Sequence, residues 1–224
     1  MTRALVFGGT GALGSAIVLG MTAAGWTVDV AARAAHDGVQ LDLSRLDWPA
    51  QRTGNYSAVV WAQGSNATAG VLETEPTQMH DLYEANVVFI TDTLRGLLEA
   101  DALEQPARGV VISSVWQQTA RSDKVAYVAS KAALAGLIPA LAADLAVRRF
   151  AINGVLPGVI DTPMTRANLT ADQLEHVQSE TLGGVLATPE DVANAVVWLT
   201  DVRAAAINAQ WIAVDNGWSA VRSV

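Results

Sequence analysis

Near the N-terminus the chain reads Ala4-Leu5-Val6-Phe7-Gly8-Gly9-Thr10-Gly11-Ala12-Leu13-Gly14. The first four residues are apolar and predict a buried strand, and a helix is expected from about residue 14 to residue 24. Glycines at such a join let the backbone turn sharply and let amides at the helix N-terminus approach a phosphate group closely. The spacing fits both G-x-G-x-x-G and G-x-x-G-x-x-G, a pattern typical of dinucleotide binding. We therefore expect a dinucleotide to contact Gly8, Thr10, Gly11, Leu13 and Gly14, and a flexible turn without a ligand is the alternative.

Short apolar runs alternate with helical stretches along the rest of the chain. This pattern predicts an α/β fold in which a parallel sheet carries helices on both faces. Because the 224 residues contain no linker, we expect a single domain over residues 1–224, with a doubly wound Rossmann-type sheet of about seven strands. The expected strands cover residues 4–7, 27–31, 39–41, 58–61, 110–112, 152–155 and 211–214, and the expected long helices cover residues 77–99, 125–148 and 189–199. Between the second and third strands, residues 33–38 are too few for a crossover helix, so we expect a bare loop.

The composition argues against several classes of protein. A net charge of −8 disfavours nucleic acid or an anionic membrane as a partner, because such partners attract basic patches. The chain has no cysteine, which excludes a disulfide framework and thiolate metal sites and fits a reducing compartment. Glycines at positions 8, 9, 11, 14 and 20 argue against a signal peptide at the apolar N-terminus. We expect a soluble cytoplasmic protein that acts on a small molecule and holds no metal.

The segment Tyr127-Val-Ala-Ser-Lys131 carries the clearest catalytic signal. In a helix, positions four residues apart share one face, so this spacing sets a phenol against an ammonium group. A cation beside a phenol favours the phenolate and lowers its pKa toward the range in which it exchanges protons at neutral pH. The chain has two lysines, Lys124 and Lys131, so the pairing is not expected by chance. The alternative is a surface tyrosine beside a solvated lysine.

The end of the second expected strand indicates which dinucleotide binds. An acid at this position normally binds the ribose 2′-hydroxyl of NAD, but here the chain reads Ala31-Ala32-Arg33. The guanidinium of Arg33 suits a 2′-phosphate, which favours NADP(H) and leaves NAD(H) possible. Asp29 lies within the strand, too deep for the role of the acid. A solvated loop arginine is the alternative.

With these motifs in view, the chain resembles the short-chain dehydrogenase/reductase family along nearly its whole length. Val110-Val-Ile-Ser-Ser114 resembles the strand that ends in the family's catalytic serine, and Asn86 lies where its active-site asparagine is expected. Asn153-Gly-Val-Leu-Pro-Gly158-Val-Ile-Asp-Thr162 resembles the segment that closes over the nicotinamide. The family's Asn-Asn-Ala-Gly is Trp61-Ala-Gln-Gly64 here, and the glycine spacing is closer to its extended members. The resemblance implies further cofactor contacts at Asp42, Leu43, Ala62, Gly64, Tyr127, Lys131, Pro157, Gly158, Ile160 and Thr162.

The resemblance also implies an activity, hydride transfer between a nicotinamide and a carbonyl or secondary alcohol. Tyr127 would exchange the proton, Lys131 would lower its pKa and hold the nicotinamide ribose, and Ser114 would donate a hydrogen bond to the substrate oxygen. Asn86 would position a water that feeds protons to Lys131. A sensor or scaffold protein that binds the dinucleotide without turnover is the alternative. An epimerase or dehydratase is disfavoured by the length of the chain.

The substrate is expected at the carboxyl end of the sheet, in a pocket formed by Ser114, Trp116, Tyr127 and Met164. A mobile lid is expected over residues 163–184, where acids outnumber the single arginine, Arg166. This charge pattern favours an apolar or neutral carbonyl compound over a phosphorylated one. The resemblance further implies a homodimer or homotetramer that associates through the helices at 77–99 and 125–148, in which Val88, Leu94, Leu134 and Leu141 serve either the interface or the core. The residues name neither the substrate nor the direction of the reaction.

Overall fold

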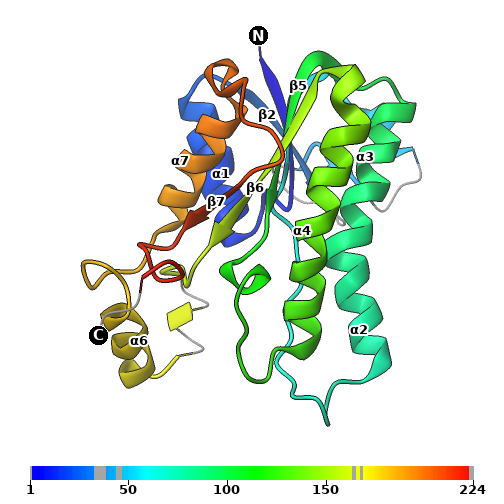
Figure 1. The fold of residues 1–224 in the computed structure, drawn as a ribbon. Coiled ribbons are helices and arrows are strands. Elements are labelled where there is room, and N and C mark those ends of the chain that lie inside the picture. Colours follow the sequence, from blue (N-terminus) through cyan, green and yellow to red (C-terminus); the bar gives the residue numbers. More distant parts are fainter. Residues whose placement is uncertain (1, 33–38, 44–46, 163–164, 167–168, 222–224) are drawn as a thin grey trace.

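The computed structural model describes residues 2–32, 39–43, 47–162, 165–166 and 169–221. A single sheet holds seven strands in the order β3-β2-β1-β4-β5-β6-β7, and every neighbouring pair is parallel (Figure 1). The order reverses between β1 and β4, which is where open α/β sheets bind ligands. The strands are β1 Arg3–Phe7, β2 Thr27–Ala32, β3 Leu41–Asp42, β4 Tyr56–Trp61, β5 Leu103–Ile112, β6 Phe150–Pro157 and β7 Trp211–Val214.

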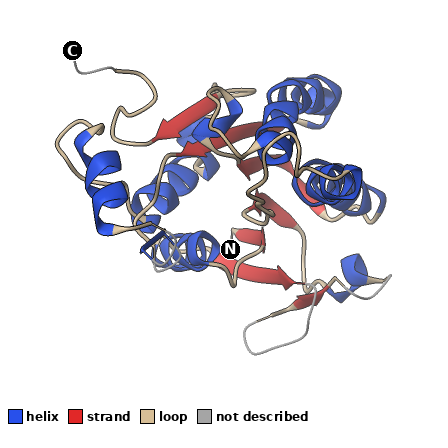
Figure 2. Cartoon of the chain, turned by 90° about the horizontal axis from the view of Figure 1, so that it is seen from below, coloured by secondary structure: helices blue, strands red, loops and turns tan. Residues whose placement is uncertain are grey.

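Helices cover both faces of the sheet, as the alternating pattern predicts (Figures 1 and 2). Helices α1 and α7 pack together on one face, and the segment from α2 to α3 lies beside α4 on the other. Each face has its own apolar core, built around Ile17 and Val196 on the first side and around Leu94 and Leu134 on the second. The α-helices are α1 Ala12–Ala23, α2 Pro76–Tyr83, α3 Phe89–Glu99, α4 Val125–Leu145, α6 Ala171–Ser179 and α7 Pro189–Thr200.

The parallel register brings distant parts of the sequence to one edge. Phe7, the last residue of β1, is paired with Ala31 of β2 and with Trp61 of β4. The residues that follow these three strands therefore emerge side by side. This geometry places the glycine loop, the end of β2 and the segment after β4 around one space.

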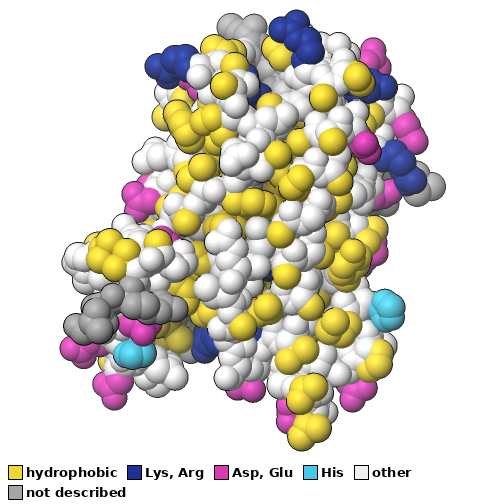
Figure 3. Space-filling model, viewed as in Figure 1, with side chains coloured by type: hydrophobic (Ala, Val, Ile, Leu, Met, Phe, Trp, Pro, Cys, Tyr) yellow, Lys and Arg dark blue, Asp and Glu magenta, His cyan; other side chains and the backbone are white. Residues whose placement is uncertain are grey.

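Helix α4 has one face against the sheet and one face toward solvent. Together with the 3-10 turn that follows it, α4 forms a stretch, Val125–Arg148, that is long and apolar enough to cross a membrane by length and composition. Leu134, Ile138, Ala142 and Leu145 of this stretch are nevertheless buried against the sheet. Of the four apolar residues expected in either the core or an interface, Leu94 and Leu134 lie in the core, whereas Val88 and Leu141 are half-buried. Figure 3 shows further hydrophobic side chains exposed over this side of the molecule.

Several boundaries differ from the sequence expectation. β5 begins at Leu103 and not near residue 110, and Leu103 pairs with Tyr56 of β4. The sequence pattern missed this first part of the strand because it contains charged and polar residues. The helix expected at 77–99 contains a π-helical segment, Glu84–Val88, between α2 and α3. The expected bare loop at 33–38 lies outside the described residues, and only positions 33–40 separate β2 from β3.

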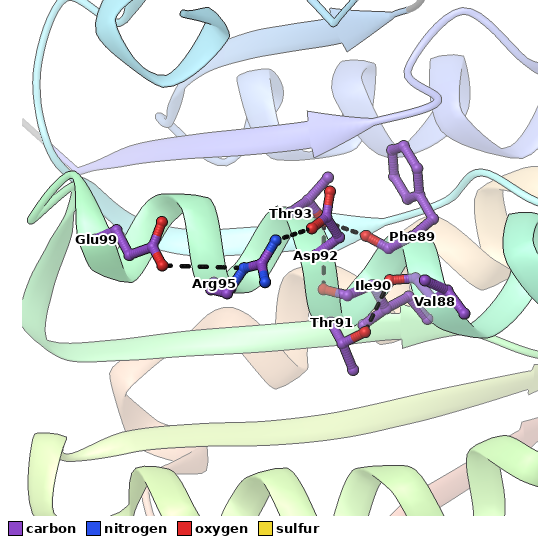
Figure 4. A network of polar contacts seen from close by, with 8 residues as sticks. All are labelled: Val88, Phe89, Ile90, Thr91, Asp92, Thr93, Arg95 and Glu99. Carbon is purple, nitrogen blue, oxygen red and sulfur yellow. Dashed lines mark hydrogen bonds and ion pairs between the residues drawn. The ribbon is translucent and has the colours of Figure 1, made fainter. Parts of the chain in front are cut away.

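The start of α3 is tied to the sheet through Thr93. Its hydroxyl donates to the carbonyl of Phe89 at 2.6 Å (Figure 4) and accepts the indole N–H of Trp61 at 2.9 Å. Trp61 is fully buried, so this hydrogen bond satisfies the polar atom of a large core side chain. On the solvent side of the same helix, Arg95 pairs with Asp92 and Glu99 (Figure 4). Trp61, which departs from the family's asparagine, is thus accommodated by the helix that packs on β4.

Candidate active site

The glycine loop combines positions that the fold requires with one that it does not. Gly8 has φ +75°, and a Cβ there would lie 2.7 Å from the backbone nitrogen of Gln63. A Cβ on Gly14 would lie 2.0 Å from the carbonyl oxygen of Gly8. A Cβ on Gly11 would meet only that same oxygen, at an ordinary 3.5 Å, and Gly11 is the N-cap residue of α1, with no side chain to cap the helix. The uncapped helix N-terminus at Gly11 therefore fits a bound anion.

A pocket of about 310 Å³ opens at this edge of the sheet. Six of its lining residues were expected cofactor contacts, and six were not expected. The expected residues are Gly8, Thr10, Gly11, Leu43, Ala62 and Gly64, and the others are Ala31, Ala32, Gln63, Ser65, Ala85 and Phe89. Gln63 Oε1 is buried and accepts no hydrogen bond from the described residues. The pocket thus offers backbone at three strand ends and one buried acceptor, which fits a dinucleotide.

Some of the missed residues had a signal in the sequence. Ala31, Ala32, Gln63 and Ser65 lie at or just after the ends of β2 and β4, the sheet edge at which open α/β folds bind ligands. The two that come from the helical segment, Ala85 and Phe89, reach the pocket only through the packing of that segment on β4. Of the expected contacts, Leu13, Gly14, Asp42, Tyr127 and Lys131 do not line it.

Asp29, the one acid within β2, is occupied. Its carboxylate accepts two hydrogen bonds from Arg3 Nη1, at 2.8 and 3.0 Å, and one from the buried hydroxyl of Tyr56 at 2.9 Å. Burial together with the charge of Asp29 raises the pKa of Tyr56. Because Asp29 is buried among these partners, it is not available to a ribose. Arg33 lies outside the described residues.

Ser114, Tyr127 and Lys131 come together between the end of β5 and the first turns of α4. The Ser114 hydroxyl lies close enough to the Tyr127 phenol to lower its pKa. Lys131 Nζ lies 5.9 Å from the centroid of the Tyr127 ring and donates to the carbonyl of Ile112 at 3.3 Å. Ser114 and Lys131 are both buried. The hydroxyl, the phenol and the ammonium group therefore form one cluster.

Burial controls the protonation of this cluster. It lowers the pKa of Lys131 from 10.5 to about 8, because the buried cation loses its hydration. Burial also raises the pKa of Tyr127, and the nearby Ser114 hydroxyl only partly opposes the rise. The expectation that the lysine holds the pKa of the phenol below its ordinary value is therefore wrong, because burial dominates.

Asn86 lies in the π-helical segment and faces the same cluster. Its Nδ2 donates to the carbonyl of Ser65 at 3.0 Å and to Ser130 Oγ at 2.9 Å, and its Oδ1 accepts the backbone N–H of Ser65 at 2.8 Å. A Cβ on Gly64 would lie 2.9 Å from Asn86 Oδ1 and 3.5 Å from Lys131 Nζ, so only glycine fits there. The side chain of Asn86 thus holds the segment after β4 against α4.

Lys124 anchors that same segment, and the sequence indicated no role for it. Its buried ammonium donates to Asn66 Oδ1 at 3.0 Å, to the carbonyl of Ala67 at 3.1 Å and to Thr68 Oγ1 at 2.7 Å. Lys124 Nζ also lies 5.8 Å from the centroid of the Tyr127 ring. Burial and the nearby Arg121 lower the pKa of Lys124. Both lysines of the chain therefore lie beside Tyr127.

The expected nicotinamide contacts follow β6, and they do not line the pocket. Gly158 donates to the carbonyl of Val214 at 3.0 Å, and a Cβ on it would lie 2.7 Å from Asp215 Cβ. Thr162 Oγ1 lies 3.0 Å from Thr165 Oγ1, and Ile160 forms an isolated bridge with Ala187. Pro157 ends β6. These residues lie at the same sheet edge, and Met164 lies outside the described residues.

The expected substrate side is less tightly packed. The described part of residues 163–184 contains α6, which has no buried side chain. Trp116 is half-buried, and its ring meets the ring of Trp218 edge to face, with centroids 5.1 Å apart. Ser114 Oγ accepts the backbone N–H of Trp116 at 3.3 Å. Trp116 is therefore connected directly to the cluster.

Comparisons with known proteins agree with this geometry. A family model described as enoyl-(acyl carrier protein) reductase matches residues 46–219. Uncharacterized oxidoreductase YmfI of Bacillus subtilis (strain 168) is 27% identical over 184 residues, which cover 80% of this chain and 76% of that protein. Cyclopentanol dehydrogenase of Comamonas sp. (strain NCIMB 9872) is 33% identical over 159 residues, 68% of this chain and 64% of that protein.

A solved structure shows the same fold over the whole chain. The ligand-free aldohexose dehydrogenase of Thermoplasma acidophilum superposes with a TM-score of 0.87 at 21% identity, over 100% of this chain and 96% of that one. The family model covers well over half of the 224 residues and includes Ser114, Tyr127 and Lys131. The chain therefore belongs to the short-chain dehydrogenase/reductase family and is an oxidoreductase of that family.

Proposed function

We propose that the chain transfers hydride between NADP(H) and a carbonyl or secondary alcohol, with Tyr127 as the general acid and base. The observation that carries this proposal is the cluster itself, in which the ammonium of Lys131 lies 5.9 Å from the centroid of the Tyr127 ring and the Ser114 hydroxyl lies beside the phenol. Such a pair of hydroxyls suits a single oxygen atom that gains or loses charge during the reaction. The cofactor, when bound, supplies or accepts the hydride.

Each residue of the cluster then has a role. In reduction, Tyr127 gives its proton to the substrate oxygen while Ser114 donates a hydrogen bond to it, and in oxidation Tyr127 takes the proton. Lys131, with a pKa of about 8, is poised to exchange protons with Tyr127 near neutral pH. The amide of Asn86 is already hydrogen-bonded to Ser65 and Ser130, so its role is to position the segment after β4. A water that passes protons to Lys131 would need other hydrogen-bond partners.

The preference for NADP(H) over NAD(H) rests on two observations. Ala31 and Ala32 line the pocket at the end of β2, where NAD-binding proteins carry an acid. Asp29 is held by Arg3 and Tyr56 and does not substitute for that acid. Arg33 follows directly in the sequence and would pair with the 2′-phosphate.

The substrate proposed here is an apolar or neutral carbonyl compound. The relative from Comamonas is named for a cyclic alcohol, whereas the family model is named for a carrier-linked substrate. In the segment 161–185 the one arginine, Arg166, pairs with Asp161 at 2.6 and 2.7 Å, which leaves little basic guidance for an anion. We also propose that the protein is cytoplasmic and forms a homodimer or homotetramer through the exposed apolar face of α4 and its neighbour α3, with residues 163–184 as a substrate lid.

The proposal is tested by following NADPH oxidation with ketones, quinones, keto-sugars and 3-oxoacyl thioesters, with Tyr127→Phe as the matched variant. Removing the phenol hydroxyl keeps the ring, so turnover should fall by about 10²- to 10⁴-fold while NADPH still binds. Full turnover in Tyr127→Phe would refute the mechanism. Tight NADPH binding without turnover on any of these compounds would favour the sensor or scaffold instead.

A further inference from the structure

Trp218 lies in the segment after β7, and its ring contacts Trp116 in the turn that follows β5. Its ring meets Trp116 at an interplanar angle of 74° with the centroids 5.1 Å apart, the edge-to-face geometry that aromatic pairs prefer. Both rings are half-buried, so each keeps some surface open. The contact joins two residues that are far apart in the sequence.

Trp218 is held on its other side by the expected lid. Its indole N–H donates to Glu180 Oε2 at 3.0 Å, just after α6. The carbonyl of Asn216 accepts the N–H of Leu182 at 2.8 Å, and Asn216 Nδ2 donates to the carbonyl of Val185 at 2.9 Å. The segment that carries Trp218 is therefore hydrogen-bonded along the end of the lid.

A tight turn fixes the backbone at Trp218. The buried carboxylate of Asp215 accepts the N–H groups of Gly217 and Ser219, each at 2.9 Å, and the hydroxyl of Ser219. Gly217 has φ +76°, a conformation that favours glycine. The position of the Trp218 ring is thus set by the fold on three sides and not by its own contact with Trp116 alone.

Trp116 connects this aromatic pair to the reacting atoms. Its backbone N–H donates to Ser114 Oγ, and the Ser114 hydroxyl lies beside the Tyr127 phenol. We propose that Trp218 is a specificity-determining residue, which with Trp116 forms an aromatic wall for a carbonyl compound with an apolar ring. The inference rests on the proposed function and adds the class of substrate.

The charges around this wall agree with an uncharged substrate body. Glu180 and Asp215 face the Trp218 segment, and Arg166 is engaged by Asp161. A flat apolar ring gains contact with the indole rings and needs no counter-charge.

The test compares a cyclic apolar ketone, cyclohexanone, with the small acyclic ketone acetone, using NADPH and the full chain. In Trp218→Leu, which keeps an apolar side chain, kcat/KM for cyclohexanone should fall about tenfold, mainly through KM, while that for acetone changes less than about twofold. Trp218→Phe should recover most of the loss. The Kd of NADPH, measured by nicotinamide fluorescence, should not change. Equal losses for both ketones, or a weakened NADPH complex, would overturn the proposal.

Glu180→Gln provides the matched control, because it keeps an oxygen for the indole N–H and removes only the charge. Its ketone ranking should remain that of the wild type, and a ranking altered as in Trp218→Leu would assign the effect to charge instead of the ring. If the wild type reduces neither ketone, the proposed function is judged on the wider panel of carbonyl compounds. The wall is then tested by calorimetric binding of cyclohexanone to the NADPH complex, where Trp218→Leu should bind about tenfold more weakly, and equal binding by the two proteins would sink it.

Discussion

The proposed dinucleotide half of the site and the proposed substrate half are built by different parts of the chain. The dinucleotide pocket is lined largely by backbone and small side chains at the ends of β1, β2 and β4, strands that belong to the buried core. The substrate half depends on side chains from three separate segments, with Trp116 against Trp218 and Trp218 against Glu180. Its helix, α6, buries no side chain.

This difference separates stability from specificity. A change in the glycine loop displaces backbone that is continuous with the sheet, so the fold and cofactor binding change together. A change near α6 disturbs few buried contacts, so substrate choice changes while the core stays intact. Mutations in the dinucleotide half should therefore lower stability and cofactor affinity together, whereas mutations in the substrate half should change substrate choice alone.

The largest expected effect is at Lys131, where the two halves join. Lys131→Met should lower turnover by about 10²- to 10⁴-fold, because it removes the group that exchanges protons with Tyr127. The same change should raise the free energy of unfolding at pH 7 by about 1–3 kcal/mol, since a buried cation is replaced by an apolar side chain of similar length. Denaturant unfolding and steady-state kinetics test both.

The pKa of Lys131 also predicts how the free energy of unfolding changes with pH. In the folded protein the pKa of Lys131 is about 8, whereas its ordinary value is 10.5. Between these two pH values the unfolded chain holds a proton that the folded chain has released, so Lys131 makes the wild type gain stability as the pH rises. Lys131→Met should lack that gain. A variant that is less stable than the wild type at pH 7 would contradict the assignment of burial as the cause.

A pair of glycine variants tests the dinucleotide half. Gly14→Ala places a Cβ 2.0 Å from the carbonyl oxygen of Gly8, so it should cost about 2 kcal/mol or more of stability and abolish binding. Gly11→Ala has an ordinary 3.5 Å contact in the same loop, so it should fold normally yet bind NADPH about tenfold more weakly, because its methyl group faces the anion site. Thermal unfolding and fluorescence titration separate the two. Unchanged NADPH affinity in Gly11→Ala would place the pyrophosphate elsewhere.

Arg33→Ala tests whether Arg33, which follows β2 in the sequence, causes the proposed preference for NADP(H) over NAD(H). Losing a charged hydrogen bond to the 2′-phosphate should weaken NADPH by about 1.5–3 kcal/mol, roughly 10- to 150-fold in Kd, and leave NADH nearly unchanged. Titration of both cofactors into the wild type and the variant measures this difference. Equal affinities of the wild type for NADPH and NADH would refute the role of Arg33.

The two halves also differ in how far the sequence predicts them. Strand, glycine loop and helix are contiguous, so local rules predicted the sheet and three lining residues of the pocket, Gly8, Thr10 and Gly11. The spacing of four residues pointed to Tyr127 and Lys131, whereas Ser114, Leu43, Ala62 and Gly64 came from the resemblance to the family. The contact between Trp116 and Trp218 joins residues that are far apart in the sequence, and no rule based on sequence spacing predicts such a contact. The anchoring of residues 66–68 by Lys124 likewise depends on tertiary packing. Local patterns also missed that burial outweighs the lysine in setting the pKa of Tyr127.

The smallest expected effect is at the start of α6. Thr170 and Gln173 form a capping box, in which Gln173 N donates to Thr170 Oγ1 at 3.2 Å and Thr170 N donates to Gln173 Oε1 at 3.0 Å. Thr170→Ala should cost about 0.5–2 kcal/mol of local helix stability. Because α6 buries no side chain, this loss should accelerate hydrogen exchange over residues 171–179 and raise KM for the ketone, with the global unfolding midpoint and NADPH affinity unchanged. If the global midpoint falls as well, α6 belongs to the same cooperative unit as the sheet, and the two halves of the site are not independent.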